Sequence, residues 1–388
     1  MTEPGETAVA HERAPRSRLF QVSMIGLLIL VSSTLALVLA EVMIRTVVPQ
    51  QLIQIRPDIW KPADTLGWTS RPFLNTTVNT GERTVSVITD AEGLRIGVAG
   101  RQESELRVLL LGDSFMQALQ VEHKQSIAGL LEIGLTRRLD RTVAVWNAGV
   151  DGWDPPQYYM RARSLLDQYP FDLVIVALYL GNDVVEQRRD VIPPREPNKR
   201  HLIRFPRTLA WGEIIDAVLY PTNDFLETRL HLFVFLKIRL HTLLMRADLT
   251  AQYVPTALLR TEAESHRWEL TSEICADIAN AAAEHGVPTL FVPIPTPFST
   301  DPDAFRELVR GFRMDPTTFD LDQPDRLLRA ALERSGLEVV PVLDAFRRAH
   351  AAGTQVYGSV DQHLTPSGHV VLQQILEPAA ASHLRSRQ

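Results

Sequence analysis

Ser114 follows a strand-like apolar segment at a spacing that suits a nucleophile. The run Val108–Leu111 is continuously apolar, which is typical of a buried strand in a parallel sheet. Gly112 permits a tight exit from that strand, and a helix is predicted near 125–138. Ser114 would then lie at the carboxyl end of the strand, where open α/β sheets bind their ligands. A serine at this position is either a candidate nucleophile or the cap of a helix.

Three further segments place small and polar residues after apolar strands or before a helix start. In chain order they are Val143–Gly152, Leu173–Asp183 and Asp361–Gly368. A serine hydroxyl is a weak nucleophile until a base removes its proton. His363 in the last segment can act as that base, and the nearby Asp361 can orient the ring and stabilise the imidazolium. These residue types therefore favour nucleophilic catalysis at a carbonyl carbon.

In order and composition, the four segments resemble the motifs of the SGNH/GDSL hydrolase family. The elements Gly-Asp-Ser, Asn-x-Gly-x-x-Gly, Gly-Asn-Asp and Asp-x-His-Leu together span residues from about 106 to 376. The resemblance implies that Ser114 is the nucleophile, His363 the base and Asp361 its orienting partner. It further implies an oxyanion hole formed by the backbone N–H groups of Ser114 and Gly152 and by the side chain of Asn182.

Some of these assignments have alternatives. Many family members place the Asp three residues before the His, whereas Asp361 lies two residues before it. Gly149 is an alternative to Gly152 as the second oxyanion donor. Asn182 could instead serve only to tolerate an unusual backbone conformation where its strand ends. Asp113 and Asp183 are expected to support the loops through hydrogen bonds to backbone N–H groups.

The sequence gives no indication of a metal or other cofactor. Its histidines and its one cysteine, Cys275, lack metal-ligand spacing, and neither a Gly-x-Gly-x-x-Gly nor a P-loop pattern is present. His369 is a second histidine near the predicted site and is expected to pack or cap in its helix. The net charge of −6 argues against nucleic-acid binding. The oligomeric state does not follow from the sequence.

The segment Leu19–Ala40 contains 22 residues without a charge. As a helix it would be about 33 Å long, which is enough to span a bilayer. Arg13, Arg16 and Arg18 precede it and favour a cytoplasmic N-terminus, with the rest of the chain outside the cytoplasm. We predict an uncleaved signal anchor that binds the membrane. A cleaved signal peptide is the alternative, although its apolar region is usually only about 7 to 15 residues long.

Strands that alternate with helices predict an α/β fold with three layers, α/β/α, around a five-stranded parallel sheet. The resemblance to the SGNH family implies the same arrangement, a flavodoxin-like fold. Strands are predicted near 107–112, 142–146, 172–180, 288–293 and 338–343. The predicted divisions are a cytoplasmic tail (1–18), a transmembrane signal anchor (19–40), a juxtamembrane connector with a small β-rich extension (41–105) and a hydrolase domain (106–388) with an insertion near 191–265.

Two segments interrupt the alternation of strands and helices. The insertion near 191–265 is rich in proline and is expected to cover the site or rest on the membrane surface, or else to pack as an extra helix on the domain. A shorter proline-rich segment, 293–322, follows the fourth predicted strand. Because it lies on the same edge as Ser114, it is expected to line the pocket.

The leading functional hypothesis is an extracytoplasmic serine ester hydrolase that forms an acyl-serine intermediate. Its expected substrate is an acyl or acetyl ester of an envelope carbohydrate or lipid. The same intermediate could pass its acyl group to a sugar hydroxyl, which would make the protein an O-acyltransferase. A third hypothesis is a non-catalytic, membrane-tethered glycan-binding or scaffold protein, against which the presence of Ser114, Asn182, Asp361 and His363 argues.

Overall fold

The computed structural model describes residues 18–50, 52, 59–79, 83–98, 100, 103–192, 194, 220–227, 229–246, 255–312, 314–359 and 362–385. The predicted orienting residue Asp361 and nearly all of the predicted cytoplasmic tail lie outside these ranges. The chain divides into two compact units, Met1–Val48 and Pro49–Gln388. Each is considered by itself below.

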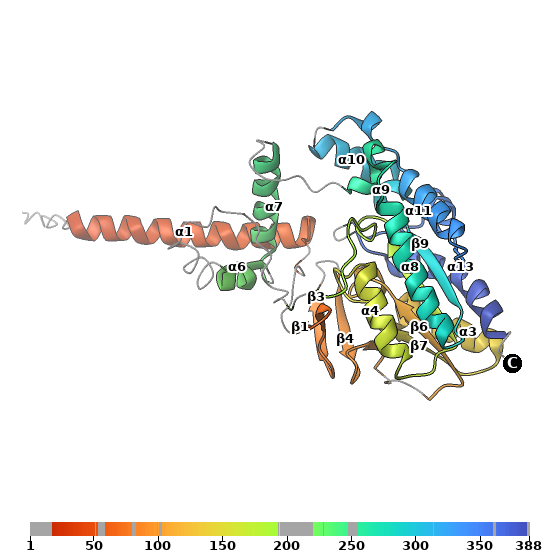
Figure 1. The fold of residues 1–388 in the computed structure, drawn as a ribbon. Coiled ribbons are helices and arrows are strands. Elements are labelled where there is room, and N and C mark those ends of the chain that lie inside the picture. Colours follow the sequence, from red (N-terminus) through yellow and green to blue (C-terminus); the bar gives the residue numbers. More distant parts are fainter. Residues whose placement is uncertain are drawn as a thin grey trace, which may run out of the picture. The chain divides into compact units, whose positions relative to one another are not determined.

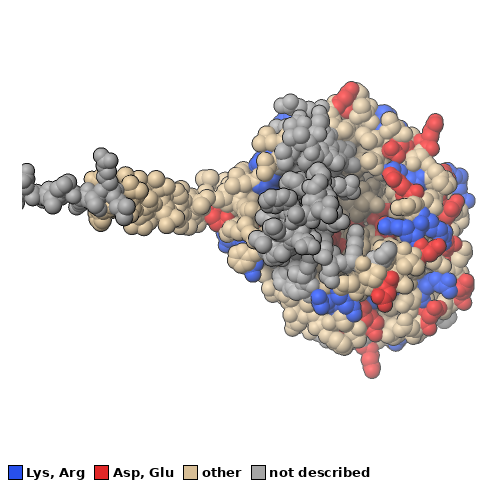
Figure 2. Space-filling view, turned by 60° about the vertical axis from the view of Figure 1, so that its left-hand side comes forward, with Lys and Arg blue, Asp and Glu red and all other residues tan. Residues whose placement is uncertain are grey.

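The first unit contains one helix, α1 (Arg18–Val47), which runs past the predicted end of the anchor at Ala40. Its segment Phe20–Val47 is long and apolar enough to cross a membrane, a property that a signal sequence near the N-terminus shares. Most apolar side chains along the helix are exposed, and Figure 2 shows a surface almost free of charged residues over most of its visible length. Glu41 and Arg45 form an ion pair of 3.0 Å in its last turns.

The second unit is built on a seven-stranded mixed sheet (Figure 1). Its strands in spatial order are β3 (Asn75–Asn79), β4 (Thr84–Thr89), β5 (Arg95–Ile96), β7 (Val143–Asn147), β6 (Leu106–Leu111), β8 (Leu173–Tyr179) and β9 (Thr289–Ile294). The neighbours among β7, β6, β8 and β9 are parallel, whereas β3, β4 and β5 continue the sheet in antiparallel pairs. A separate two-stranded sheet pairs β1 (Trp60–Ala63) with β2 (Gly67–Ser70).

The three-layer α/β/α fold is confirmed, because both faces of the central strands are buried under helices. In β6, Leu109 and Leu111 belong to one apolar cluster, and Val108 and Leu110 belong to another. All four side chains are fully buried. Alternate residues of a strand point to opposite faces, so the continuous apolar run reflects burial on both sides.

Helices α3 and α13 pack together against one face, and α4, α8 and α11 pack against the other (Figure 1). The helices are α2 (Ser114–Gln117), α3 (Ile127–Leu139), α4 (Pro155–Leu166), α6 (Tyr220–Glu227), α7 (His231–Arg246), α8 (Arg267–Glu284), α9 (Pro297–Thr300), α10 (Pro302–Phe312), α11 (Gln323–Arg334), α12 (Leu343–Ala351) and α13 (Pro366–Arg385). Short 3-10 turns lie at His123–Gln125, Thr256–Leu258, Arg260–Glu262 and Pro316–Thr318.

The prediction of a five-stranded, wholly parallel sheet was wrong in two respects. The segment 338–343 forms only one parallel bridge, between Val339 and Phe291. The next bond of this ladder would run from the N–H of residue 293 to the Val340 carbonyl. Residue 293 of β9 is a proline without an N–H, and so the pairing that Glu338 and Val340 begin with Phe291 ends there. In addition, the β-rich extension contributes β3, β4 and β5 to the main sheet instead of packing beside it.

Part of the predicted insertion forms the helices α6 and α7. Lys237 of α7 forms an ion pair with Glu227 of α6, and the backbone N–H of Gln50 donates to the ring of His231 at 2.8 Å. Val234 is buried, whereas Leu236, Leu240 and Leu243 are about half exposed. Residues 195–219 and 247–254 of the insertion lie outside the described ranges.

Candidate active site

Ser114 is the first residue of α2, immediately beyond the carboxyl end of β6. The helix is capped by Asp113, whose carboxylate accepts a hydrogen bond from the Phe115 N–H at 2.9 Å. The interpretation of Ser114 as a cap is therefore wrong, and its hydroxyl is not used for capping. Gly112 makes this turn possible, because a Cβ there would lie 2.4 Å from Cγ of Met116.

His363 reaches Ser114 from the opposite end of the sequence. Its Nε2 lies 2.9 Å from the Ser114 Oγ. Two backbone contacts hold the histidine segment. Tyr357 forms an antiparallel bridge with Leu364, and the Gly358 N–H donates to the His363 carbonyl at 2.7 Å. The imidazole ring also packs on Phe115, with 4.7 Å between ring centroids. The structure thus brings together two of the predicted site residues.

The segment after β7 packs closely against α2. The Asn147 amide donates to the Met116 carbonyl at 2.6 Å and accepts a hydrogen bond from the Gly149 N–H at 3.0 Å. A Cβ on Gly149 would lie 2.5 Å from the Gln117 nitrogen, so only glycine fits there. Because the Gly149 N–H donates to the Asn147 side chain, it is already used within the protein.

Gly152 differs from Gly149 in both conformation and bonding. Its φ of +72° is in the left-handed region that glycine adopts without strain. Within the part of the chain that the structure describes, its N–H donates to no protein group. The preceding residue, Asp151, is held on both sides, because its N–H donates to the Gln117 side chain at 3.0 Å and its carbonyl accepts from the Trp68 indole at 2.9 Å.

Asn182 and Asp183 lie just after the end of β8. Asn182 is exposed, its φ is not positive, and its side chain lies close enough to the Asp113 carboxyl to lower the pKa of that group. Asp183 is buried and accepts hydrogen bonds from the Tyr158 hydroxyl and the Tyr179 N–H, both at 2.8 Å. Asp113 thus binds the backbone N–H of the residue after Ser114, and Asp183 binds that of the last residue of β8.

Burial changes the protonation of three side chains around the site. Burial raises the pKa of Asp113 to about 6. Burial, and to a lesser extent the nearby charge of Asp113, also raises the pKa of Asp183. Burial lowers the pKa of His369 to about 3, so this ring is neutral at physiological pH. His369 is buried on α13, which agrees with the packing that the sequence predicted.

Arg95 is a supporting residue that sequence reasoning missed. It lies on β5, is only 2% exposed, and donates to the backbone carbonyls of Gln117 (2.7 Å), Ala118 and Val121 (2.6 Å). These carbonyls follow the end of α2, where no further helix turn can satisfy them. Burial lowers the pKa of Arg95 to about 10, so the guanidinium stays charged. A charged residue in a two-residue strand gave no sequence signal for burial.

The β-rich extension contacts the candidate site at further points. The Gln117 side chain donates to the Ser70 hydroxyl at 3.0 Å, and the Trp153 indole donates to the Trp68 carbonyl at 2.9 Å. Together with Arg95, these contacts hold the extension against α2 and against the segment that contains Gly152. In the described ranges, no group of three or more His, Cys, Asp or Glu residues could hold a metal ion.

No protein-family model and no curated protein matches the chain. Among solved structures, it matches the alpha/beta hydrolase enzyme LAE5 from the metagenome of Lake Arreo, Spain, at 16% identity and a TM-score of 0.40, covering 73% of this chain and 98% of that one. The acetyl xylan esterase AlAXEase matches at 11% identity and a TM-score of 0.39, covering 71% and 99%. A lipolytic protein of the G-D-S-L family from Veillonella parvula DSM 2008 matches at 10% identity and a TM-score of 0.34, covering 69% and 94%.

One of these neighbours is thus a G-D-S-L protein, the class that the four sequence motifs resemble. At these identities the likeness concerns the fold, and the chemistry follows from the geometry around Ser114.

Replacing Arg95 by Met is expected to lower the free energy of unfolding by roughly 2 to 5 kcal/mol, because buried carbonyls at the end of α2 lose their donor. Arg95→Lys keeps the charge but cannot span all the carbonyls, and so should lose less stability. Chemical denaturation measures both variants. Arg163→Met on the exposed face of α4 is the matched control and should leave the unfolding midpoint unchanged. An Arg95→Met midpoint equal to that of the control would contradict this role.

Proposed function

We propose that the protein is a serine ester hydrolase in which Ser114 attacks the acyl carbon. The observation that supports this most directly is the 2.9 Å contact between the Ser114 Oγ and the His363 Nε2 at the carboxyl end of β6. His363 takes the serine proton as the Oγ–carbon bond forms, and then gives it to the departing alcohol oxygen. Water, deprotonated by the same ring, then releases the acid from the acyl-serine.

The developing oxyanion would be bound by three donors. The Ser114 N–H lies at the start of α2, the Gly152 N–H has no described partner, and the exposed Asn182 side chain can donate from its amide. The occupied N–H of Gly149 favours Gly152 over Gly149. For Asp361 we retain the predicted role of orienting the His363 ring.

Asp113 would act through its charge as well as through its hydrogen bonds. Attraction between its carboxylate and His363 lowers the pKa of Asp113, against the larger effect of burial. By reciprocity, an ionised Asp113 stabilises the imidazolium that forms when Ser114 gives up its proton. Asp113 therefore supports both the start of α2 and the protonated base.

The proposed substrate is an acyl or acetyl ester of a carbohydrate or lipid in the cell envelope. This proposal joins the ester chemistry of the site to the apolar helix α1, which would anchor the chain with residues after Val47 outside the cytoplasm. The Ser114–His363 contact weighs against a purely scaffolding role, because a scaffold has no need of an activated serine.

Ser114→Ala is expected to abolish turnover of a short aryl acetate, with a loss of at least about a thousandfold in kcat, because no acyl-serine can form. His363→Ala should be nearly as severe. Release of the aryl alcohol is the measurement, and circular dichroism with thermal melts establishes that each variant is folded. Ser382→Ala, on an exposed part of α13, is the matched control. Full activity in Ser114→Ala would exclude the serine mechanism.

Asn182→Ala should lower kcat by about a hundredfold with little change in KM, because its amide binds the oxyanion more strongly than the ground-state carbonyl. Asn182→Gly should be equally slow. Steady-state kinetics on the aryl acetate test both, with Asn280→Ala on the exposed face of α8 as the control. If the glycine variant kept the wild-type kcat, Asn182 would have only a conformational role.

A reporter that is active only outside the cytoplasm, fused after Gln388, should be active, because Arg13, Arg16 and Arg18 precede the apolar helix. A second fusion with a reporter that is active only in the cytoplasm should be silent. The reverse pattern would overturn both the topology and the envelope substrate. Fractionation with the membrane, and an N-terminus that still begins before α1, would distinguish an anchor from a cleaved signal peptide.

A further inference from the structure

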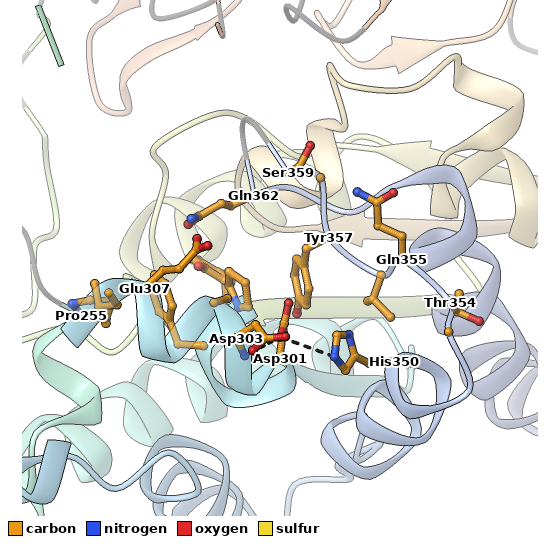
Figure 3. A pocket seen from close by; sticks show the side chains of 18 of the residues that line it. Pro255, Asp301, Asp303, Glu307, His350, Thr354, Gln355, Tyr357, Ser359 and Gln362 are labelled. Carbon is orange, nitrogen blue, oxygen red and sulfur yellow. Dashed lines mark hydrogen bonds and ion pairs between the residues drawn. The ribbon is translucent and has the colours of Figure 1, made fainter. Parts of the chain in front are cut away.

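A cavity of about 830 Å³ lies beside the candidate site, within the size range of small-molecule pockets. Its walls come from the end of β8, from α9 and α10, and from residues 353–359 and Gln362, with Ile238 of α7 also lining it. Figure 3 shows its labelled side chains, including Asp301, Asp303 and Glu307 from the α9–α10 region. The proline-rich segment 293–322 thus contributes to a pocket wall, as its position in the sequence indicated.

The cavity lies on the histidine side of the proposed reaction centre. Gln362, which lines it, directly precedes His363, and the lining residue Tyr179 stacks on Phe115, which in turn packs on the His363 ring. Neither Gly152 nor Asn182 lines it. In acyl transfer to serine, the protonated base gives its proton to the leaving oxygen, so the leaving alcohol lies on the side of the base. The position of the cavity therefore suits the alcohol part of an ester.

The charged lining of the cavity is acidic. Asp301, Asp303 and Glu307 contribute carboxylates, and none of its described lining residues is a lysine or arginine. Asp301 lies 3.5 Å from His350, the contact drawn in Figure 3, and Asp303 pairs with Arg306 outside the lining. Glu307 is exposed one helical turn after Asp303 on the same face of α10. A ligand with negative charge would be repelled here.

The remaining lining combines hydrogen-bonding groups with aromatic rings. Gln355, Gln362 and Thr354 provide amides and a hydroxyl, and Tyr357 and Phe298 provide ring surface. Carboxylates and amides bind ligand hydroxyls, while aromatic rings pack against apolar C–H faces. A sugar ring presents both kinds of surface. A plain acyl chain would leave the polar groups of the wall without partners.

We propose that this cavity binds the alcohol part of the substrate as a sugar unit that carries no negative charge, either a neutral sugar or an amino sugar. The proposal rests on the proposed ester chemistry at Ser114 and adds the class of alcohol that the enzyme accepts. It excludes alcohols with a phosphate or carboxylate next to the ester.

The test compares acetate esters that differ only in the alcohol: an acetylated neutral oligosaccharide, an acetylated amino-sugar oligosaccharide and an acetylated uronic-acid oligosaccharide. A short aryl acetate, too small to fill the cavity, reports on the chemistry alone. The wild-type protein should show a kcat/KM at least about tenfold higher for the neutral or the amino sugar than for the uronic acid. Whichever of the neutral-sugar and amino-sugar esters is hydrolysed faster identifies the class of sugar that the cavity binds.

Two variants test whether the cavity causes this preference. Glu307→Lys should reduce the preference over the uronic acid by about tenfold, whereas Glu273→Lys, at an exposed position of α8, should leave it unchanged. Ala304→Trp should fill part of the cavity and lower the ratio of sugar-acetate to aryl-acetate kcat/KM by about tenfold. Thermal melts establish that the variants remain folded.

The outcomes separate this proposal from the one on which it rests. If the folded wild-type protein hydrolyses none of the esters, the proposed function fails. If it hydrolyses the aryl acetate but shows no preference among the sugars, or if Glu307→Lys behaves like Glu273→Lys, the cavity does not select the alcohol and the inference is wrong. A long-chain aryl ester is assayed as a further substrate of Ala304→Trp. If this variant slows only that ester, the cavity binds the acyl chain and the inference is likewise overturned.

Discussion

Close packing of the backbone between α2 and the segment after β7 is the constraint on which the candidate site depends. At Gly149 the two segments approach so closely that a methyl group would overlap the Gln117 backbone. The Asn147 side chain fixes this approach by bonding to both segments at once. The two backbone N–H groups proposed for the oxyanion hole, on Ser114 and Gly152, therefore belong to one rigid unit, as preorganised stabilisation requires.

The β-rich extension is part of this unit. Its Arg95 satisfies carbonyls at the end of α2, and its Trp68 holds Asp151 beside Gly152. Both residues precede the predicted start of the hydrolase domain at 106, yet both support the turn that presents Ser114. A boundary near 105 would cut through the central packing of the site, because β5 is hydrogen-bonded to β7.

The sequence indicated the Ser114–His363 pair because each residue occurs in a motif at a recognisable strand end or helix start. Four strands were predicted because their continuous apolar runs reflect burial on both faces. The segment 338–343 has the same apolar character, but Pro293 of β9 has no N–H to offer the Val340 carbonyl, and so the pairing stops after one bridge. Arg95 and the joining of β3, β4 and β5 to the main sheet could not be predicted, because these short, mostly polar strands owe their place to distant partners. The role of Asp361 stays a prediction.

The order of strands in the sheet has a consequence for how the chain folds as it is synthesised. β5 leaves the ribosome before β6, and its partner β7 is made later still. Until then the inner edge of β5 has no strand to pair with. The guanidinium of Arg95 likewise lacks the carbonyls of Gln117, Ala118 and Val121 until the segment after β6 is made. The N-terminal strands are thus synthesised first, but their pairing with the rest of the sheet is completed late. During that interval the open edge of β5 is a place where two nascent chains could pair wrongly.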